Sequence, residues 1–281
     1  MKISTASLEG KVVVITGGGG VLCGVLAKAI ARQNAKVAIL DLNEAAAQEL
    51  AEEISKSGGI AMGVKANVLD PKSLEEAKSH IHKVYGTCDI LINGAGGNHP
   101  DGTTTNTSFR PGDETQNGLK TFFDLDPKGI QFVSDLNFMG TFLPTQVFTK
   151  DMLGKSGCAV LNISSMNAYR PLTKIPAYSA AKAAVSNFTQ WLAVHLAPMG
   201  IRVNAIAPGF FVTDQNRSLL LDERGALTQR GQTIIEHTPM GRFGKAEDLI
   251  GASLWLLSQE SEFVTGTIIP IDGGFSAFSG V

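Results

Sequence analysis

The sequence has little of what disulfide-stabilised, metal-binding, membrane-spanning or nucleic-acid-binding proteins need. Its three cysteines, Cys23, Cys88 and Cys158, are odd in number and far apart, which argues against a disulfide framework or a zinc site. A formal net charge of −2 gives no reason to expect nucleic acid or an anionic membrane as a partner. No apolar run reaches membrane-spanning length, and residues 1–10 contain no signal-peptide core. We therefore expect a cytoplasmic protein with reduced thiols.

The histidines are few and scattered as well. Five are present, and they form no convincing ligand cluster, so we expect no bound metal. His80 and His82 lie on a predicted helix, where we expect them on an exposed, solvated face.

Short apolar runs alternate with helical patterns along the whole chain. With 43% hydrophobic and 18% charged residues, the chain can bury a full core. No repeat, linker or low-complexity block divides residues 1–281, so we predict one α/β domain. The predicted strands are 11–16, 36–40, 60–65, 89–93, 158–163, 201–206 and 267–271, and the predicted helices after the first are 44–57, 71–85, 132–152, 178–197 and 246–257.

A glycine cluster follows the first predicted strand. Gly17 to Gly20 come directly after Thr16, and a helical run to Arg32 follows. Glycines let the backbone approach a pyrophosphate, and a helix N-terminus supplies free N–H groups and positive potential. Tight turns also collect glycine, but this cluster stands between a strand and a helix. We predict a phosphate cradle here.

An acid, Asp41, ends the second predicted strand. A carboxylate at this point suits bonding to the adenosine ribose hydroxyls of NAD and would repel the 2′-phosphate of NADP. The next residue, Leu42, is not basic. Asp41 could also cap the helix that follows through Glu44, and the two roles are compatible. The combination favours NAD.

A serine, a tyrosine and a lysine follow the strand 158–163. Ser165 lies just beyond it, while Tyr178 and Lys182 are four residues apart and therefore project from one face of an Ala-rich helix. An ammonium beside a phenol favours the phenolate, which lowers a pKa of about 10 toward the range of a general acid/base. Tyr-x-x-x-Lys also occurs by chance with the tyrosine packed in a core, so the rest of the chain decides.

Two long irregular stretches also follow predicted strands. Asn98 to Asp126 is polar and has no sustained periodicity, and such a connection inside a compact domain is usually a functional loop or a disordered one. We predict a substrate-rim insertion at about 98–130. A second irregular region with short helical patches predicts a lid at about 209–244.

These motifs occur in the order and spacing of a known family. The chain resembles the short-chain dehydrogenase/reductases at Thr16-Gly17 with its glycine cluster, Asn93-Gly94-Ala95-Gly96, Asn137, Ser165, Tyr178-x-x-x-Lys182 and Pro208-Gly209. The resemblance implies a single Rossmann-like doubly wound domain with a seven-stranded parallel sheet flanked by helices. It also implies NAD as cofactor and a homotetramer.

The resemblance implies a role for each matching residue. Tyr178 would be the general acid/base at the substrate carbonyl, and Ser165 would hydrogen-bond the same oxygen. Lys182 would bind the nicotinamide ribose and lower the pKa of Tyr178, while Asn137 would hold a water that links Lys182 to solvent. The implied cofactor contacts are Gly17, Gly19, Gly20, Val21, Leu22, Asp41, Asn67, Val68, Asn93, Ala95, Gly96, Tyr178, Lys182, Pro208, Gly209, Phe211 and Thr213.

The chain departs from the family pattern twice. The family's glycine pattern is Thr-Gly-x-x-x-Gly-x-Gly. In this chain Val21 and Cys23 occupy the last two glycine positions, and Gly20 and Gly24 lie beside them. The family's Asn-Asn-Ala-Gly has Gly94 in place of the second asparagine.

A narrower likeness concerns the substrate. Segments 162–176, 207–217 and 237–244, the insertion and the ending at 272–280 are similar to the short-chain-type D-mannonate oxidoreductases, also called fructuronate reductases. This implies interconversion of D-mannonate and D-fructuronate. The alternatives are a gluconate 5-dehydrogenase or polyol dehydrogenase of the same family, and a non-catalytic dinucleotide-binding sensor or scaffold. The last would predict a broken catalytic set, whereas all four residues are present.

A sugar acid needs a cation for its carboxylate and short polar groups for its hydroxyls. Arginine suits the carboxylate because its planar fork binds bidentately, so Arg170 and then Arg217 are the leading candidates. The predicted substrate residues are Asn98, Asn167, Arg170 and Arg217, with His99, Arg110, Lys174, Gln215 and Asn216 close to them in sequence.

Overall fold

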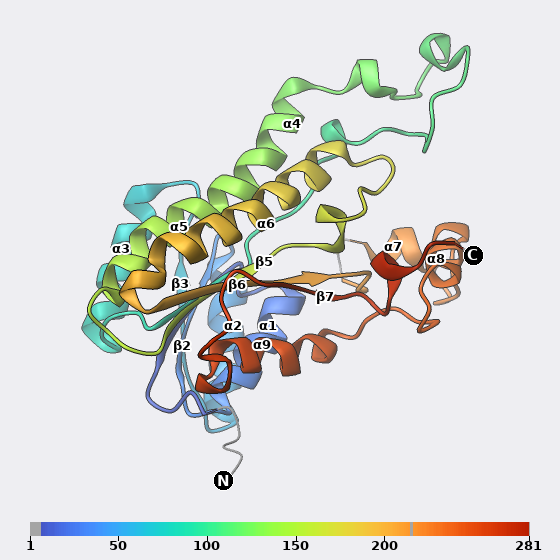
Figure 1. The fold of residues 1–281 in the computed structure, drawn as a ribbon. Coiled ribbons are helices and arrows are strands. Elements are labelled where there is room, and N and C mark those ends of the chain that lie inside the picture. Colours follow the sequence, from blue (N-terminus) through green and yellow to red (C-terminus); the bar gives the residue numbers. More distant parts are fainter. Residues whose placement is uncertain (1–6, 214–215, 281) are drawn as a thin grey trace.

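Seven parallel strands form one sheet in the computed structural model, which describes residues 7–213 and 216–280 (Figure 1). The strand order is β3-β2-β1-β4-β5-β6-β7. All seven predicted strands are present, and β6 runs two residues further than predicted. The order changes direction between β1 and β4, where doubly wound sheets bind their ligands. The strands are β1 (Val12–Thr16), β2 (Lys36–Asp41), β3 (Ile60–Lys65), β4 (Ile90–Asn93), β5 (Cys158–Ile163), β6 (Ile201–Pro208) and β7 (Ile268–Ile271).

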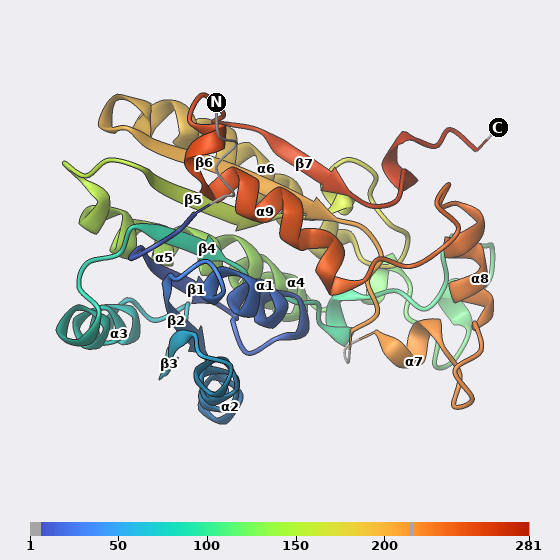
Figure 2. The same ribbon diagram turned by 90° about the horizontal axis from the view of Figure 1, so that it is seen from below.

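Helices cover both faces of this sheet (Figure 2). Because successive strand residues point to opposite faces, Val13 and Ile15 enter one buried core while Val12 and Val14 enter the other. Burial on both faces explains why the strands are continuous apolar runs. One face carries α1 (Val21–Ala31), α2 (Glu44–Lys56) and α9 (Ile250–Leu257), and the other carries α3 (Pro71–Val84), α4 (Pro127–Ser134), α5 (Gly140–Phe148) and α6 (Pro176–Leu196).

The helix predicted over 132–152 is different in the structure. It begins at Pro127, where the Asp126 side chain accepts a hydrogen bond from the Lys128 amide at 2.8 Å. It then widens into a π-helix at Asp135–Met139 before α5. The predicted start was wrong because Asp126 and Pro127 are a capping pair.

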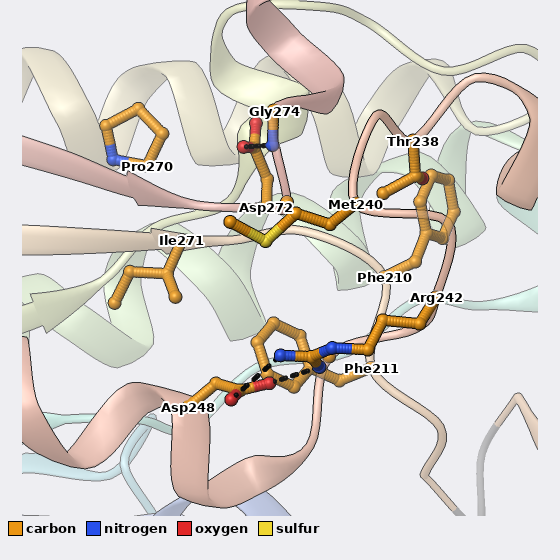
Figure 3. A pocket seen from close by; sticks show the side chains of 12 residues that line it. Phe210, Phe211, Thr238, Met240, Arg242, Asp248, Pro270, Ile271, Asp272 and Gly274 are labelled. Atoms are coloured by element: carbon orange, nitrogen blue, oxygen red, sulfur yellow. Dashed lines mark hydrogen bonds and ion pairs between the residues drawn. The ribbon is translucent and has the colours of Figure 1, made fainter.

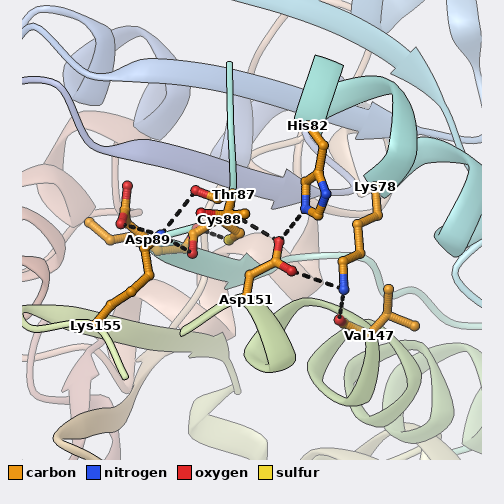
Figure 4. A network of polar contacts seen from close by, with 9 residues as sticks. Lys78, His82, Thr87, Cys88, Asp89, Val147, Asp151 and Lys155 are labelled. Atoms are coloured by element: carbon orange, nitrogen blue, oxygen red, sulfur yellow. Dashed lines mark hydrogen bonds and ion pairs between the residues drawn. The ribbon is translucent and has the colours of Figure 1, made fainter. Parts of the chain in front are cut away.

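A network of charges lies at the amino edge of the sheet, away from the strand ends that carry the motifs (Figure 4). The Asp151 carboxylate contacts Lys78 Nζ at 2.9 Å and His82 Nε2 at 2.6 Å, and it accepts the Cys88 amide at 3.1 Å. Burial acts to raise the pKa of Asp151, but the hydrogen bonds from His82, Lys78 and the Cys88 amide outweigh it, so the pKa is lowered. His80 is exposed as predicted, whereas the solvated role for His82 was wrong.

The two irregular stretches lie beyond the carboxyl edge of the sheet (Figure 1). The first contains three short 3-10 helices, Pro100–Gly102, Asp113–Thr115 and Phe122–Asp124. It is tied to the rest of the domain by the Thr104 amide, which donates to the Lys174 carbonyl at 2.9 Å. The second contains α7 (Arg217–Leu220) and α8 (Gln229–Glu236). In the part of the chain that the structure describes, no helix is long and apolar enough to cross a membrane.

Candidate active site

Buried amides and hydroxyls join the strands where the sheet ends. Asn93 pairs in register with Asn162, and its Nδ2 donates to Asn162 Oδ1 at 2.8 Å and to Thr145 Oγ1 at 2.9 Å. Asn162 Nδ2 in turn donates to Thr189 Oγ1 at 2.9 Å. Because Thr145 lies on α5 and Thr189 on α6, these hydrogen bonds fix both helices to the strand ends.

Next to this network of amides and hydroxyls, three side chains come together: Ser165, Tyr178 and Lys182. Ser165 is two residues beyond β5, and its hydroxyl hydrogen-bonds the Tyr178 phenol. Tyr178 and Lys182 share one face of α6, and Lys182 Nζ lies 5.7 Å from the centroid of the Tyr178 ring. The ammonium is buried and donates to the Ile163 carbonyl at 2.8 Å. A proton donor, a second hydroxyl and a cation therefore share one small region.

The pKa values of this group do not follow the sequence-based expectation. Burial raises the pKa of Tyr178, and the hydrogen bond with Ser165 opposes that rise only in part. The prediction that Lys182 lowers the pKa of Tyr178 was wrong, because the effect of burial on that pKa is the largest one. Burial also lowers the pKa of Lys182 to about 8, since a charged ammonium loses its hydration there.

Asn137 approaches the same group from the π-helix. Its Nδ2 donates to the carbonyls of Gly97 and Val133, each at 2.7 Å. A β-carbon added at Gly96 would lie 2.7 Å from Asn137 Oδ1 and 3.2 Å from Lys182 Nζ, so the two side chains converge over this glycine. π-Bulges are frequent at functional sites, and this one brings the fourth predicted catalytic residue to the other three.

The glycine turn between β1 and α1 leaves backbone amides without a capping group, where they can bind a phosphate. Gly17 has φ +62°, and a β-carbon there would lie 2.8 Å from the backbone of Ala95. Gly20 is the N-cap residue of α1 and provides no side-chain cap. The first amides of α1, including those of Val21 and Leu22, therefore face outward without a capping group, as an anion site requires.

Asp41 holds this turn from the end of β2. Its Oδ2 accepts the Gly19 amide at 3.0 Å, and its Oδ1 accepts the Asn43 amide at 2.9 Å. Asn43 rather than Asp41 caps α2, by accepting the Ala46 amide at 3.3 Å. The alternative capping role for Asp41 was therefore wrong, and its carboxylate lies against the glycine turn instead.

The remaining predicted cofactor residues lie around the same edge. Asn67 and Val68 follow β3, and Pro208 ends β6. Gly209 has to be small because a β-carbon there would lie 2.6 Å from Asp272. Phe211 is buried, and the Thr213 amide is fixed by Asn216 Oδ1 at 2.8 Å. These residues thus lie along the carboxyl edge of the sheet, where Gly209 makes a close approach to Asp272.

The two departures from the family pattern are in contact with each other. A β-carbon at Gly94 would lie 2.1 Å from the Cys23 sulfur, although the two residues are far apart in sequence. The side chain that the family places after β4 is absent, and Cys23 fills that space from α1. Each departure therefore compensates for the other. The sequence shows both changes but not that they meet.

The predicted substrate residues are not all together. Asn167 is buried beside Ser165, and its Oδ1 has no hydrogen-bond partner in the described chain. Asn98 Nδ2 donates to Thr103 within the insertion at 3.0 Å, and Arg170 Nε donates to the Ser276 carbonyl at 3.2 Å. Arg217 is exposed at the start of α7, and Gln215 lies outside the described residues. Among the predicted substrate residues that the structure describes, Asn167 is the one whose buried polar atom lacks a hydrogen-bond partner.

A cavity of about 350 Å³ lies between the ends of β6 and β7 and the lid (Figure 3). Its charged side chains are already satisfied. Arg242 forms two hydrogen bonds to Asp248, at 2.6 and 3.2 Å, and the Asp272 carboxylate accepts the amides of Gly274 and Ser276. The cavity therefore offers an anion no free cation. In the parts that the structure describes, no cluster of His, Cys, Asp and Glu is arranged to hold a metal.

Comparison with known proteins gives a consistent picture. A family model described as enoyl-(acyl carrier protein) reductase matches residues 22–276. A solved structure from Haemophilus influenzae, named as a candidate D-mannonate oxidoreductase with bound NAD, is 56% identical, covers 98% of each chain and has a TM-score of 0.94. The uncharacterized oxidoreductase UxuB of Bacillus subtilis is 52% identical over 276 residues, 98% of each chain. The 5-keto-D-gluconate 5-reductase of Escherichia coli K12 is 31% identical over 95% of this chain and 96% of its own.

Proposed function

This chain belongs to the short-chain dehydrogenase/reductase family, and we propose that it is an NAD-dependent oxidoreductase that interconverts a sugar acid and its keto form. The preferred pair is D-mannonate and D-fructuronate. The observation that carries the proposal is the convergence of Ser165, Tyr178, Lys182 and Asn137 at the carboxyl edge of the sheet. The likeness to the Haemophilus structure with bound NAD supports the choice of cofactor and substrate.

The residues present fit NAD. Gly17 lets the turn pack closely against Ala95, and Gly20 leaves the first amides of α1 uncapped for a pyrophosphate, while Asp41 offers a carboxylate to which a ribose hydroxyl can donate. The same carboxylate would repel the 2′-phosphate of NADP. Leu42, the neighbouring residue, is 67% exposed and supplies no compensating cation. When bound, NADH supplies the hydride, and the protein supplies position and field.

Tyr178 acts as the acid in the direction of reduction. Because its pKa is raised, the phenol remains protonated at neutral pH and donates its proton to the carbonyl oxygen as negative charge develops there. Ser165 donates a hydrogen bond to the same oxygen and stabilises that charge. In the reverse direction the Tyr178 phenolate accepts the hydroxyl proton of the sugar acid.

Lys182 and Asn137 resupply the proton. A lysine with a pKa of about 8 gains and loses a proton close to neutral pH, so it suits exchange with the Tyr178 phenolate. We place a water at Asn137 that links Lys182 to solvent, as expected from the family resemblance. The site is closed by the proposed lid at about 209–244 and the proposed rim insertion at about 98–130.

Three other functions have less support than the D-mannonate proposal. Reduction of 5-ketogluconate is favoured by the Escherichia coli relative, which is 31% identical, and a polyol dehydrogenase would share the same machinery. A non-catalytic sensor would have no need for an intact set of proton-transfer residues. The unpartnered, buried Asn167 amide oxygen also favours a hydroxylated substrate.

The assembly and location are proposals as well. Trp191 is 57% and Val194 78% exposed on α6, so we propose that this face forms part of a homotetramer. The tail contributes less, because Phe275 packs on Phe210 of the same chain with ring centroids 5.2 Å apart. We propose a cytoplasmic location, where the three buried cysteines remain thiols. The molar mass in solution tests the assembly.

The substrate proposal is tested by NADH oxidation. We expect kcat/KM for D-fructuronate to exceed that for 5-ketogluconate, and both to exceed that for the uncharged ketohexose fructose. If 5-ketogluconate is the better acid, the gluconate alternative replaces the mannonate proposal. If fructose matches the acids, the substrate is a polyol rather than a sugar acid.

A further inference from the structure

A second cavity, of about 400 Å³, lies between α8 and the loop that leads from the catalytic serine to α6. Its walls include Lys174 from that loop, Arg230 from α8 and Thr107 from the insertion. Phe210, which follows the Pro208-Gly209 turn, forms another wall. The cavity thus joins three segments that follow the ends of β4, β5 and β6.

The two cations in this cavity are free. Neither Lys174 nor Arg230 has an ion-pair partner within residues 7–213 and 216–280, and no acidic residue lines the cavity. The first cavity differs because its arginine is already neutralised by Asp248. Two unpaired cations in a partly enclosed space attract an anion, and an arginine can hold a carboxylate bidentately.

Both cations are held in place by their backbones. Lys174 has φ +74°, one of two positive values among the described non-glycine residues, and its carbonyl accepts the Thr104 amide of the insertion. Such strain persists only where the surroundings hold it. Arg230 shares one face of α8 with Thr233 and His237. Thr228 caps this helix by accepting the Gly231 amide at 3.1 Å.

The rest of the lining suits hydroxyl groups. Thr107, Gln229 and Thr233 bring two hydroxyls and an amide. His237 Nδ1 hydrogen-bonds the Thr233 carbonyl at 2.7 Å, which leaves Nε2 available to a ligand. The cavity therefore combines free cations with short polar groups, the chemistry that a polyhydroxylated carboxylate requires.

The position of this cavity relative to Tyr178 fits the length of a keto sugar acid. In D-fructuronate three hydroxyl-bearing carbons separate the carboxylate from the keto carbon, so the carboxylate has to bind at a distance from Tyr178. Lys174 precedes Tyr178 by four residues, a separation that the backbone spans in at most about 14 Å. The same three-carbon spacing occurs in 5-ketogluconate, so one carboxylate site serves both candidate substrates.

We propose that Lys174 and Arg230 together bind the substrate carboxylate in the cavity between α8 and the catalytic loop. The proposal rests on the proposed sugar-acid function and replaces Arg170 and Arg217 as the carboxylate partners. Arg170 is engaged with the tail through Ser276, and Arg217 lines neither cavity. The lid and the loop thus recognise the charged end, while Ser165 and Tyr178 act on the keto end.

Binding without turnover tests this assignment directly. D-Mannonate and the neutral D-mannitol are titrated into the enzyme–NADH complex by calorimetry, where no hydride transfer to either alcohol occurs. We expect Lys174→Met and Arg230→Met each to weaken D-mannonate binding about 10- to 100-fold, the range for a charged hydrogen bond, and to leave D-mannitol unchanged. Arg230→Lys should recover part of the loss. Arg224→Met, which removes an exposed arginine from the same lid, is the matched control and should bind like wild type.

Kinetics separates this proposal from the proposed function. We expect both Met variants to raise KM for D-fructuronate at least about tenfold while kcat changes less than about threefold. If wild type reduces the acids and both variants retain its KM and binding, the carboxylate assignment is overturned while the proposed function stands. If wild type neither reduces a sugar acid nor prefers D-mannonate over D-mannitol, the proposed function falls, and the assignment falls with it.

Discussion

Lys78 and Lys182 lie at opposite edges of the same sheet, both with little exposure to solvent, and have opposite surroundings. Lys78, at the amino edge, has a side chain that is 12% exposed and an ion pair with Asp151 at 2.9 Å. Lys182, at the carboxyl edge, is 3% exposed and donates only to the Ile163 carbonyl among the described groups. Both ammonium groups lose water, but only Lys78 gains an acid in exchange.

The difference in their surroundings distinguishes Lys78, which has a structural role, from Lys182, which has a functional one. At the amino edge Asp151 is satisfied by Lys78, His82 and the Cys88 amide (Figure 4), so this network holds α3 against the chain that leads into β5. At the carboxyl edge no acidic side chain within residues 7–213 and 216–280 forms an ion pair with Lys182. The nearby Cys23 thiol stays neutral because burial raises its pKa to about 12. An uncompensated buried ammonium lowers stability, and it places a titrating group beside Tyr178.

The largest expected effect is on turnover at the carboxyl edge. Tyr178→Phe keeps the shape of the ring but removes the proton that is donated to the carbonyl oxygen, so we expect kcat to fall about 10²- to 10⁴-fold. NADH affinity and the unfolding midpoint should remain close to wild type. The measurement is steady-state kinetics with D-fructuronate beside fluorescence titration of NADH. A variant with wild-type kcat would remove Tyr178 from the mechanism.

A smaller effect is expected from packing at the carboxyl edge. Gly94→Ala places a methyl group 2.1 Å from the Cys23 sulfur, and we expect it to lower the free energy of unfolding by about 1–3 kcal/mol. Cys23→Gly should recover part of the loss in the double variant, because it removes the sulfur but leaves the Thr16 carbonyl 2.8 Å from the same methyl group. Urea unfolding of the single and double variants measures this coupling. Additive losses would show that the two departures are independent.

The smallest expected effect concerns the cofactor. Asp41→Ala removes both the ribose acceptor and the charge that opposes a phosphate, so the preference for NADH over NADPH in kcat/KM should narrow about tenfold or more. It also frees the Gly19 and Asn43 amides, so NADH binding should weaken. Asp41→Asn is the control that keeps hydrogen-bonding capacity but removes the charge. A wild-type preference for NADPH would contradict this role of Asp41.

Much of the fold follows from the sequence because local patterns decide it. Short, mostly apolar runs predicted every strand, and the glycine cluster after Thr16 predicted the turn into α1. The π-helix at Asn137 was missed because its widening depends on contacts with Gly97, which is far away in sequence. His82 was misplaced because its partner, Asp151, arrives from another element.

The candidate site, too, could be predicted from the sequence only in part. The catalytic residues are recognisable because Tyr178 and Lys182 repeat a fixed helical spacing. The contact between Cys23 and Gly94 is not readable, since only the pairing of β1 with β4 brings the two turns together. Arg230 carries no local signal either, because its relation to Lys174 depends on how the lid folds against the catalytic loop.

The central claim is that Lys182 acts in turnover whereas Lys78 acts in stability, and their methionine variants test it side by side. The pKa of Lys182 is lowered from 10.5 to about 8, so between these values the unfolded chain holds a proton that the folded protein has released. Stability therefore rises with pH across this window, and below about pH 8 the charged Lys182 lowers it.

The decisive measurement is kcat with D-fructuronate and the free energy of unfolding at pH 7 for Lys182→Met and Lys78→Met. We predict that Lys182→Met loses at least about 10²-fold in kcat while its stability is kept or raised. Lys78→Met should keep kcat but lose about 1–3 kcal/mol of stability, because Asp151 loses one of its three partners while His82 and the Cys88 amide remain. The account is contradicted if Lys182→Met is the destabilised variant, or if Lys78→Met loses turnover at unchanged stability.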